Sequence, residues 1–360
     1  MSKKIGILTS GGDCAGLNSV LKAVTYRAIL GYGWEVCGIR QGTMGFLRYP
    51  LDVCALTLDH FDSAGARLGG TILGTTNKGN PFHYLMPDGS YKDRSEEIVQ
   101  ACHDLGLEAL IGVGGDGSLK ILHKLFSKAN VPFIGIPKTI DNDLGSTERS
   151  IGFSTAVEVA TEALDRLQPT AASHDRVMVL EVMGRDAGHI ALSAGIAGGA
   201  DIVIIPEIQY NFKKIVEKIQ ELFKRGRNYA LVVVAEAVKK QDGQSSSVID
   251  PVTGRPHYSG IGHYFSDQIT ELTGAVTRFT VLGHVQRGAQ PIADDRVLAS
   301  AFGVKAVDLI AEGKHNRMVA WQNRGVVDVP VLEAIERYSA VNPKSTLVAT
   351  ARGLGISFGD

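Results

Sequence analysis

The chain has 360 residues, 44% of them hydrophobic, and its formal net charge is −1. Because a single hydrophobic core stops growing at about 250–300 residues, a chain of this length is expected to form two domains. Nearly balanced charge argues against nucleic acid or an anionic membrane as a partner, and the sequence lacks the apolar run of about 18 residues that a transmembrane helix needs.

Short apolar runs alternate with helix-like stretches along the whole chain. The runs end in glycine-rich or charged turns, as in KIGILTSGGD, EALIGVGGDGS, VPFIGIPKTIDND, DRVMVLEVMGR and TRFTVLGHVQRG. This alternation predicts an α/β fold of two similar Rossmann-like domains, each with a mostly parallel sheet flanked by helices. Such sheets bind ligands at the carboxyl ends of their strands, which is where the glycines and aspartates cluster here.

The first glycine turn, TSGGDCAGLN (9–18), follows a predicted strand and precedes a predicted helix. Glycines let a phosphate approach the backbone, and a helix N-terminus offers free N–H groups and a positive dipole end. The turn matches neither a Walker A loop nor the fingerprint of a dinucleotide-binding dehydrogenase. It is therefore either a phosphate-binding turn or an ordinary strand-to-helix connection.

A second glycine turn, GVGGDGSLK (112–120), contains an acidic residue. We expect Ser118 to cap a helix that begins near Leu119. A carboxylate inside a phosphate cradle would repel the ligand, so Asp116 is interpreted as a residue that holds Mg²⁺, an ion that bridges and neutralises phosphates.

A third strand-end loop, PKTIDND (137–143), carries two carboxylates two residues apart. A sugar hydroxyl that accepts a phosphoryl group needs a base to take its proton. Asp141 is predicted to be that base and Asp143 its hydrogen-bonding neighbour; the alternative is that both are turn or helix-capping residues.

Two further segments stand out in the second half. Residues 154–175 are predicted to form a long helix that ends near Pro169. Residues 238–260, rich in Ser, Gly and Pro, are predicted to be a surface insertion.

Cationic side chains follow the strands of the second half. Arg185 lies in a glycine turn before a predicted helix, and a planar guanidinium suits bidentate binding of phosphate. Arg278, His284 and Arg287 flank a strand that we expect to be buried, where they favour an anionic ligand. With the glycine turns and aspartates, these residues predict phosphoryl transfer to a hydroxyl of an already phosphorylated small molecule.

The motifs GGTILGT, GVGGDGS, PKTIDND, EVMGRDAGHIAL and TVLGHVQRG, in this order, resemble those of the bacterial-type 6-phosphofructokinases, and the resemblance runs nearly end to end. It implies a kinase of glycolysis that transfers phosphate from ATP, with Mg²⁺, to the 1-hydroxyl of fructose 6-phosphate, giving fructose 1,6-bisphosphate and ADP. It also implies a cytoplasmic, allosteric homotetramer without nucleic-acid or membrane partners. The nucleotide-binding domain would comprise residues 1–150 plus about 286–335, and the fructose 6-phosphate-binding domain 151–285 plus about 336–360.

The resemblance also implies roles residue by residue. The residues implied to bind the nucleotide are Gly12, Asn77, Lys78, Gly115, Asp116, Gly117 and Ser118, with Asp116 serving Mg²⁺. Those implied to be catalytic are Thr139, Asp141, Asp143 and Arg185. Those implied to bind the sugar phosphate are Thr139, Asp141, Met183, Gly184, Arg185, Glu236, His284 and Arg287, with Arg176 and Arg278 reaching in from a neighbouring subunit.

Several positions depart from the family pattern. Asn77 stands where the bacterial ATP enzymes carry an arginine, and Lys78 beside it offers only a point charge. Lys22, Tyr26 and His60 stand where arginines of the effector site are usual, which puts a response to ADP or phosphoenolpyruvate in doubt. The insertion and the tail after Val341 receive no role.

Two positions bear on the phosphoryl donor, and they conflict. Gly117 is typical of ATP enzymes in the family, whereas Lys138 is typical of pyrophosphate enzymes. An Asp at position 117 would exclude ATP by charge and bulk, but Lys138 only adds attraction for phosphate, which both donors carry. ATP is therefore the predicted donor, and a pyrophosphate-dependent fructose 6-phosphate 1-phosphotransferase is the alternative.

Overall fold

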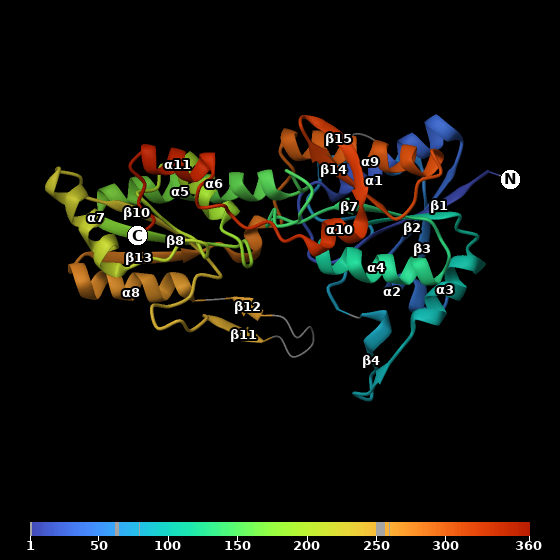
Figure 1. Ribbon diagram of the computed structural model, residues 1–360, viewed down its shortest axis with the longest axis horizontal. Coiled ribbons are helices and arrows are strands. Elements are labelled where there is room, and N and C mark those ends of the chain that lie inside the picture. Colours follow the sequence, from blue (N-terminus) through green and yellow to red (C-terminus); the bar gives the residue numbers. More distant parts are fainter. Residues whose placement is uncertain (1, 62–64, 79, 250–255, 259) are drawn as a thin grey trace. The chain divides into compact units, whose positions relative to one another are not determined.

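The computed structural model describes residues 2–61, 65–78, 80–249, 256–258 and 260–360 (Figure 1). The chain divides into two compact units. Unit 1 comprises Met1–Thr139, Leu144–Thr155 and Arg287–Tyr338, and unit 2 comprises Ile140–Asp143, Ala156–Gln286 and Ser339–Asp360. The assignment of a nucleotide-binding and a sugar-phosphate-binding domain stays a prediction.

Unit 1 is built on a mixed sheet with the strand order β15-β14-β7-β6-β1-β2-β3. The strands are β1 (Lys4–Thr9), β2 (Glu35–Ile39), β3 (Val53–Leu56), β6 (Ala109–Gly114), β7 (Phe133–Pro137), β14 (Arg317–Gln322) and β15 (Gly325–Pro330). The inner strands are parallel, and β3 and β15 pair antiparallel at the two edges. The carboxyl ends of the neighbouring strands β1, β6 and β7 therefore meet at one edge of the sheet, as their apolar runs predicted.

Helices cover both faces of this sheet. They are α1 (Leu17–Tyr26), α2 (Met44–Leu47), α3 (Ser95–Asp104), α4 (Asp116–Lys128), α9 (Ala293–Ala311) and α10 (Val331–Glu336), with the π-helix η1 (Arg27–Gly31) and the 3₁₀ turns η2 (Leu58–Phe61), η3 (Gly65–Arg67) and η4 (Pro81–His83). A small hairpin is formed by β4 (Tyr84–Leu85) and β5 (Tyr91–Lys92). Figure 1 shows α1 and α9 on one face and α3 and α4 on the other.

The core of unit 1 fixes the position of α4. Leu122 and Phe126 of α4 are fully buried, and the Phe126 ring stacks on Phe133 of β7 with 5.9 Å between centroids. This packing holds the N-terminus of α4 at the carboxyl end of β6, where a phosphate site is expected.

Unit 2 contains a parallel sheet with the order β13-β8-β10-β9. Its strands are β8 (Arg176–Val182), β9 (Ile202–Ile204), β10 (Ala230–Ala235) and β13 (Val276–Val281). The helices are α5 (Phe153–Ser173, which begins in unit 1), α6 (His189–Ala197), α7 (Phe212–Lys224), α8 (Ile261–Thr273) and α11 (Thr346–Gly353), with the 3₁₀ turn η5 (Gly283–Gln286). In Figure 1, α5, α6 and α11 cover one face of this sheet and α8 the other.

The predicted end of the long helix near Pro169 is wrong. Helix α5 continues through Pro169 to Ser173. Proline removes one backbone donor from the helix, but Ala171 beyond it is fully buried against Met178 and Leu231, and this packing outweighs the lost hydrogen bond.

The strand in TRFTVLGHVQRG was expected to be buried, and this prediction is wrong. β13 is an edge strand, and only Thr277 among its residues is buried. Its apolar pattern is therefore that of a strand with one open edge and partly exposed faces.

The predicted surface insertion 238–260 contains a two-stranded hairpin. Strands β11 (Ser247–Ile249) and β12 (Pro256–Tyr258) pair antiparallel, and residues 250–255 and 259 lie outside the described part. Across the described residues, no helix is both long and apolar enough to span a membrane.

Candidate active site

The glycine turn after β1 is hydrogen-bonded to the loop that follows Leu73. The Gly11 N–H donates to Thr76 O at 2.9 Å, and Thr75 Oγ1 donates to Gly11 O at 2.7 Å. Gly11 has φ +83°, and a Cβ there would lie 2.9 Å from Ser118 Oγ. Glycine is therefore required, both for the backbone conformation and for the close approach of the next strand's turn.

Two cations lie against this turn. The Lys138 side chain is only 4% exposed, and its Nζ donates to Gly12 O. Arg287 Nη1 donates to Asp13 O at 3.0 Å and would lie 3.0 Å from a Cβ on Gly12. Two positive groups beside bare backbone make the turn attractive to a phosphate.

Helix α4 starts earlier than the sequence predicted. Its first residue is Asp116, after Gly115 at the N-cap, and no side chain caps it. Ser118 therefore lies in the first helical turn, where its Oγ accepts a hydrogen bond from Ser10 Oγ at 3.1 Å. The reason is that Gly115 adopts an extended conformation directly after the strand, so the helix begins with no linker.

The donor set around Asp116 fits Mg²⁺. Asp116 is exposed in the first turn of α4, beside the glycine turns of β1 and β6. Mg²⁺ at phosphate sites is typically held by one or two carboxylates, with waters and phosphate oxygens completing the octahedron. An exposed carboxylate in the first turn of α4 is suited to that role.

Asn77 and Lys78 belong to the same edge of unit 1. Both are exposed, and the Lys78 N–H donates to Thr76 Oγ1 at 3.1 Å. Because the carbonyl of Thr76 accepts from Gly11, the structure brings these two predicted nucleotide-binding residues to the glycine turn.

The loop 137–143 passes from unit 1 to unit 2. Thr139 ends its stretch of unit 1, and its carbonyl accepts from Ser150 Oγ at 2.7 Å. Asp141 and Asp143 belong to unit 2 and are 2% and 8% exposed. Asp143 Oδ2 lies 3.9 Å from Arg185 Nη1, so the structure brings a predicted companion of the base to a predicted phosphate-binding arginine.

The turn after β8 is the centre of the unit 2 site. The N–H groups of Gly184 and Arg185 donate to Glu236 Oε1 at 3.2 and 2.9 Å. Arg185 has φ +50°, a left-handed conformation that costs a non-glycine residue about 1–3 kcal/mol. Glu236 follows the neighbouring strand β10 and is 8% exposed, so a buried carboxylate holds this strained turn in place.

Two predicted sugar-phosphate residues lie away from this turn within one chain. Arg176 begins β8, so the seven-residue strand separates it from the turn by about 20 Å. Arg278 sits opposite Met178 in β13, and its Nη1 donates to Thr277 O at 2.8 Å. His284 is exposed in η5, whose Gln286 accepts a hydrogen bond from Met183 of the turn.

Arg287 differs in another way, because the structure places it in unit 1 against Gly12, whereas Glu236 and His284 belong to unit 2. The roles assigned to these residues stay predictions.

Sequence reasoning missed several residues that shape the site. Gln286 is fully buried, and its Oε1 accepts from the Met183 N–H at 2.8 Å. Its polarity inside GHVQRG was the only sequence signal. Tyr258 of the hairpin donates to Asp186 Oδ1 at 2.5 Å, a contact 72 positions long that local pattern does not reveal.

Asp295 is a buried carboxylate that the sequence did not single out. It accepts from the N–H groups of Gly152 and Thr155 at 2.9 and 2.8 Å, and from Thr155 Oγ1 at 2.6 Å. Burial raises the pKa of Asp295, and these hydrogen bonds act in the opposite direction. Asp295 thus holds the chain at the start of α5.

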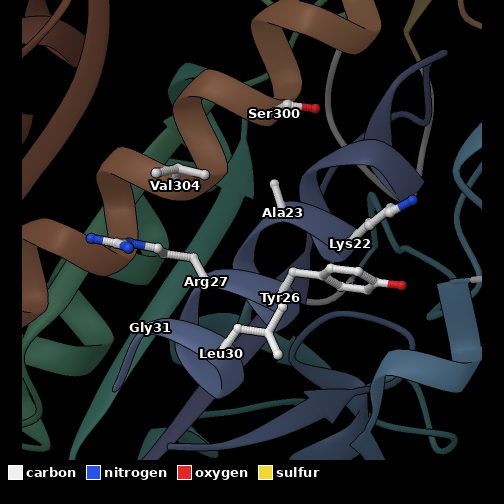
Figure 2. Close-up of a pocket in the computed structure, with 8 residues that line it drawn as sticks. All are labelled: Lys22, Ala23, Tyr26, Arg27, Leu30, Gly31, Ser300 and Val304. Atoms are coloured by element: carbon white, nitrogen blue, oxygen red, sulfur yellow. The ribbon is translucent and has the colours of Figure 1, made fainter. Parts of the chain in front are cut away.

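A cavity of about 400 Å³ opens between α1, η1 and α9 of unit 1 (Figure 2). Lys22 and Tyr26, whose positions the resemblance assigns to an effector site, line it, and Lys22 Nζ lies 5.1 Å from the Tyr26 ring centroid. Arg27 at its rim pairs with Asp308 at 2.7 Å. Whether the chain responds to an effector stays a prediction.

Comparisons with known proteins agree with this geometry. Residues 4–310 match the family described as "Phosphofructokinase". "ATP-dependent 6-phosphofructokinase 1" of Nostoc sp. is 58% identical over 100% of this chain and 99% of its own length, and the protein of the same name from Synechocystis sp. is 57% identical over 99% of both. The solved structure of phosphofructokinase from Saccharomyces cerevisiae superposes with a TM-score of 0.78 at 28% identity, covering 99% of this chain and 48% of that one.

Proposed function

The chain belongs to the phosphofructokinase family, and we propose that it is an ATP-dependent 6-phosphofructokinase, which transfers a phosphoryl group to the 1-hydroxyl of fructose 6-phosphate. The observation that carries the proposal is full-length identity of 57–58% to curated proteins of that name. The local geometry of each unit supports it, because each offers the groups that one of the two substrates requires.

Unit 1 supplies the groups for the nucleotide. The phosphates would bind to the backbone of the glycine turns, at the N-terminus of α4, with Lys138 compensating their charge. Arg287, which the resemblance assigns to the sugar phosphate, lies against the same turn and would add a second positive charge there. Mg²⁺, held by Asp116 and phosphate oxygens, would neutralise charge on the transferring group. Gly117 in the first turn of α4 contributes no side chain, which leaves room for the rest of the nucleotide.

Unit 2 supplies the groups for the acceptor. Asp141 would take the proton of the attacking 1-hydroxyl, since a positioned carboxylate is a suitable general base for this step. Arg185 would stabilise the negative charge of the transferring phosphoryl group, and Asp143, 3.9 Å from its Nη1, would orient it. Catalysis of this kind is mostly positioning and charge compensation.

The base assignment is tested by Asp141→Asn. Removing the base is expected to lower kcat by about 10²- to 10⁴-fold while KM for both substrates stays within a few fold. Asp165→Asn, at an exposed position of α5, is the matched control and should behave as wild type. An Asp141→Asn enzyme with near wild-type kcat would show that another group accepts the proton.

The choice of donor is tested with purified protein, Mg²⁺ and fructose 6-phosphate. ATP should support turnover at least tenfold faster than pyrophosphate, because Gly117 has no side chain that would exclude the nucleotide. Equal or faster turnover with pyrophosphate would favour the pyrophosphate-dependent alternative.

We further propose a cytoplasmic homotetramer whose substrate sites are completed by a neighbouring subunit. In the edge strand β13, Val276, Phe279 and Val281 are 43–47% exposed, and apolar exposure at a sheet edge suits contact with a second copy of the chain. Arg176 and Arg278 lie along this part of the sheet, away from the Arg185 turn of their own chain.

Subunit sharing has a direct test. Sedimentation should give the mass of four chains, and Phe279→Asp should lower it. Mixing Asp141→Asn with Arg278→Ala subunits after partial dissociation should restore activity, because a hybrid contains some sites with both residues intact. No recovery from exchanged subunits would contradict shared sites.

A further inference from the structure

Hairpin β11–β12 and its residue Tyr258 form a contact that the proposed mechanism does not use. The hairpin belongs to the segment that joins β10 to α8. This segment begins at Glu236, at the carboxyl end of the unit 2 sheet. The start of this segment is tied to the loop before α7 and to α8: Tyr210 Oη donates to Lys239 O at 2.9 Å, and the Gln241 N–H donates to Tyr264 Oη at 3.3 Å. From there the hairpin reaches back to the turn that follows β8.

The contact is made at the centre of that turn. The turn is closed by the Ala187 N–H, which donates to Gly184 O at 3.1 Å, so Arg185 and Asp186 are its two central residues. Glu236 holds the backbone of Arg185, and Tyr258 Oη donates to Asp186 Oδ1 at 2.5 Å. The two central residues are thus each held by a group from the segment after β10.

The surroundings place the phenol close to the charged groups of the site. Burial, the hydrogen bond to Asp186 and the charges of Asp186 and Glu236 together raise the pKa of Tyr258 to about 12, and the charge of Arg185 opposes the shift. A hydroxyl with this pKa keeps its proton across the physiological range, so it remains a donor to Asp186 under all assay conditions of interest.

The strain in the turn and the hydrogen bond act against each other. A left-handed conformation is strained for a residue such as Arg185 and persists only where the surroundings over-determine it. A hydrogen bond to a charged acceptor is stronger than one between neutral groups. Losing the one from Tyr258 is therefore expected to let the turn relax in a substantial fraction of molecules.

We propose that Tyr258 is a positioning residue of the sugar-phosphate site: through Asp186 it fixes the turn that presents Arg185 to the phosphorylated substrate. The inference rests on the proposed function and deepens it, because it gives the insertion a role in the binding of fructose 6-phosphate. Tyr258 acts through Asp186 and Arg185 and makes no contact with the reacting atoms in this role.

The test compares Tyr258→Phe with wild type in steady-state kinetics. Removing only the hydroxyl should raise KM for fructose 6-phosphate about tenfold, equivalent to about 1.4 kcal/mol, with kcat within about twofold and KM for ATP unchanged. Asp186→Ala should have the same effect, and the double variant should be no worse than either single variant, because both remove one interaction. Asp186→Asn retains an acceptor oxygen and should recover most of the affinity.

The matched control is Tyr264→Phe, which also deletes a tyrosine hydroxyl from a hydrogen bond to this segment but leaves Asp186 untouched. It should keep the wild-type KM. An equal rise of KM in Tyr264→Phe would mean that general loosening of the segment is responsible, and an active Tyr258→Phe enzyme with wild-type KM would also overturn the inference. A wild-type protein that turns over no fructose 6-phosphate overturns the proposed function itself, and the two failures are thereby distinguished.

Discussion

Replacing Lys138 by methionine is expected to weaken the binding of ATP and pyrophosphate alike. The lysine is buried at the end of β7, and its ammonium donates to Gly12 O in the glycine turn after β1. Methionine keeps a side chain of similar length and removes only the charge and the donors. The change therefore isolates the contribution of the cation to phosphate binding.

The size of the effect follows from the contact. A hydrogen bond between a charged donor and a phosphate contributes about 1.5–3 kcal/mol, and each 1.4 kcal/mol is a factor of ten, so KM for ATP should rise by about 10- to 150-fold. Arg287 remains at the same turn, so binding is weakened and not abolished. The inhibition constant of pyrophosphate against ATP should rise by a similar factor, because both ligands present phosphate oxygens to the same ammonium.

The assay measures KM for ATP and fructose 6-phosphate and the inhibition constant of pyrophosphate, with thermal melting to verify folding. Lys213→Met is the matched control, since Lys213 is exposed at the start of α7 in unit 2. An unchanged KM for ATP would refute the role of Lys138 in the nucleotide site. A loss confined to pyrophosphate would instead make Lys138 the residue that selects the donor.

Two further predictions concern unit 1, at a glycine and at a buried carboxylate. Gly117→Asp should lower kcat/KM for ATP by about 100-fold or more, because like charges in contact cost several kcal/mol. A coupled assay with each donor should show a far smaller decrease of kcat/KM for pyrophosphate. Asp295→Ala should lower the free energy of unfolding by about 2–5 kcal/mol, because the buried N–H groups of Gly152 and Thr155 each lose an acceptor, whereas the exposed neighbour Asp294→Ala should cost less than about 1 kcal/mol. Burial raises the pKa of Asp295, so the folded chain binds the proton of this carboxyl group more tightly than the unfolded chain does. The contribution of Asp295 to the free energy of unfolding therefore falls as pH rises through the raised pKa. Chemical denaturation should accordingly show a larger gap between wild type and Asp295→Ala at acidic than at neutral pH, and a gap that widens with pH would contradict the reasoning.

Local pattern was sufficient for the elements that carry the site. Strands β1, β6 and β7 could be predicted because each is a buried apolar run that ends in a glycine or charged turn, and that signal lies within ten residues. The start of α4 was misplaced because Ser118 is a good cap by residue type, whereas in the structure Gly115 takes the N-cap position and no side chain caps the helix.

Contacts across long stretches of chain could not be predicted. Arg287 lies 274 positions from Asp13, whose carbonyl it binds, and nothing in either segment specifies the other. The exposure of β13 likewise depends on the strand order of the sheet. An apolar run has the same sequence pattern whether its strand lies in the middle or at the edge of a sheet. Sequence reasoning therefore supplied candidate groups, and tertiary packing decided which of them meet.

The division of the chain has a consequence for how this enzyme could be rebuilt or inherited. The polypeptide crosses from one unit to the other after Thr139, Asp143, Thr155, Gln286 and Tyr338. Two of these crossings bracket the four-residue stretch that holds the proposed base, and another falls between Gln286 and Arg287 inside GHVQRG. No single cut in the gene separates the two units, and a chimaera of two homologues would have to be spliced inside its own catalytic loops.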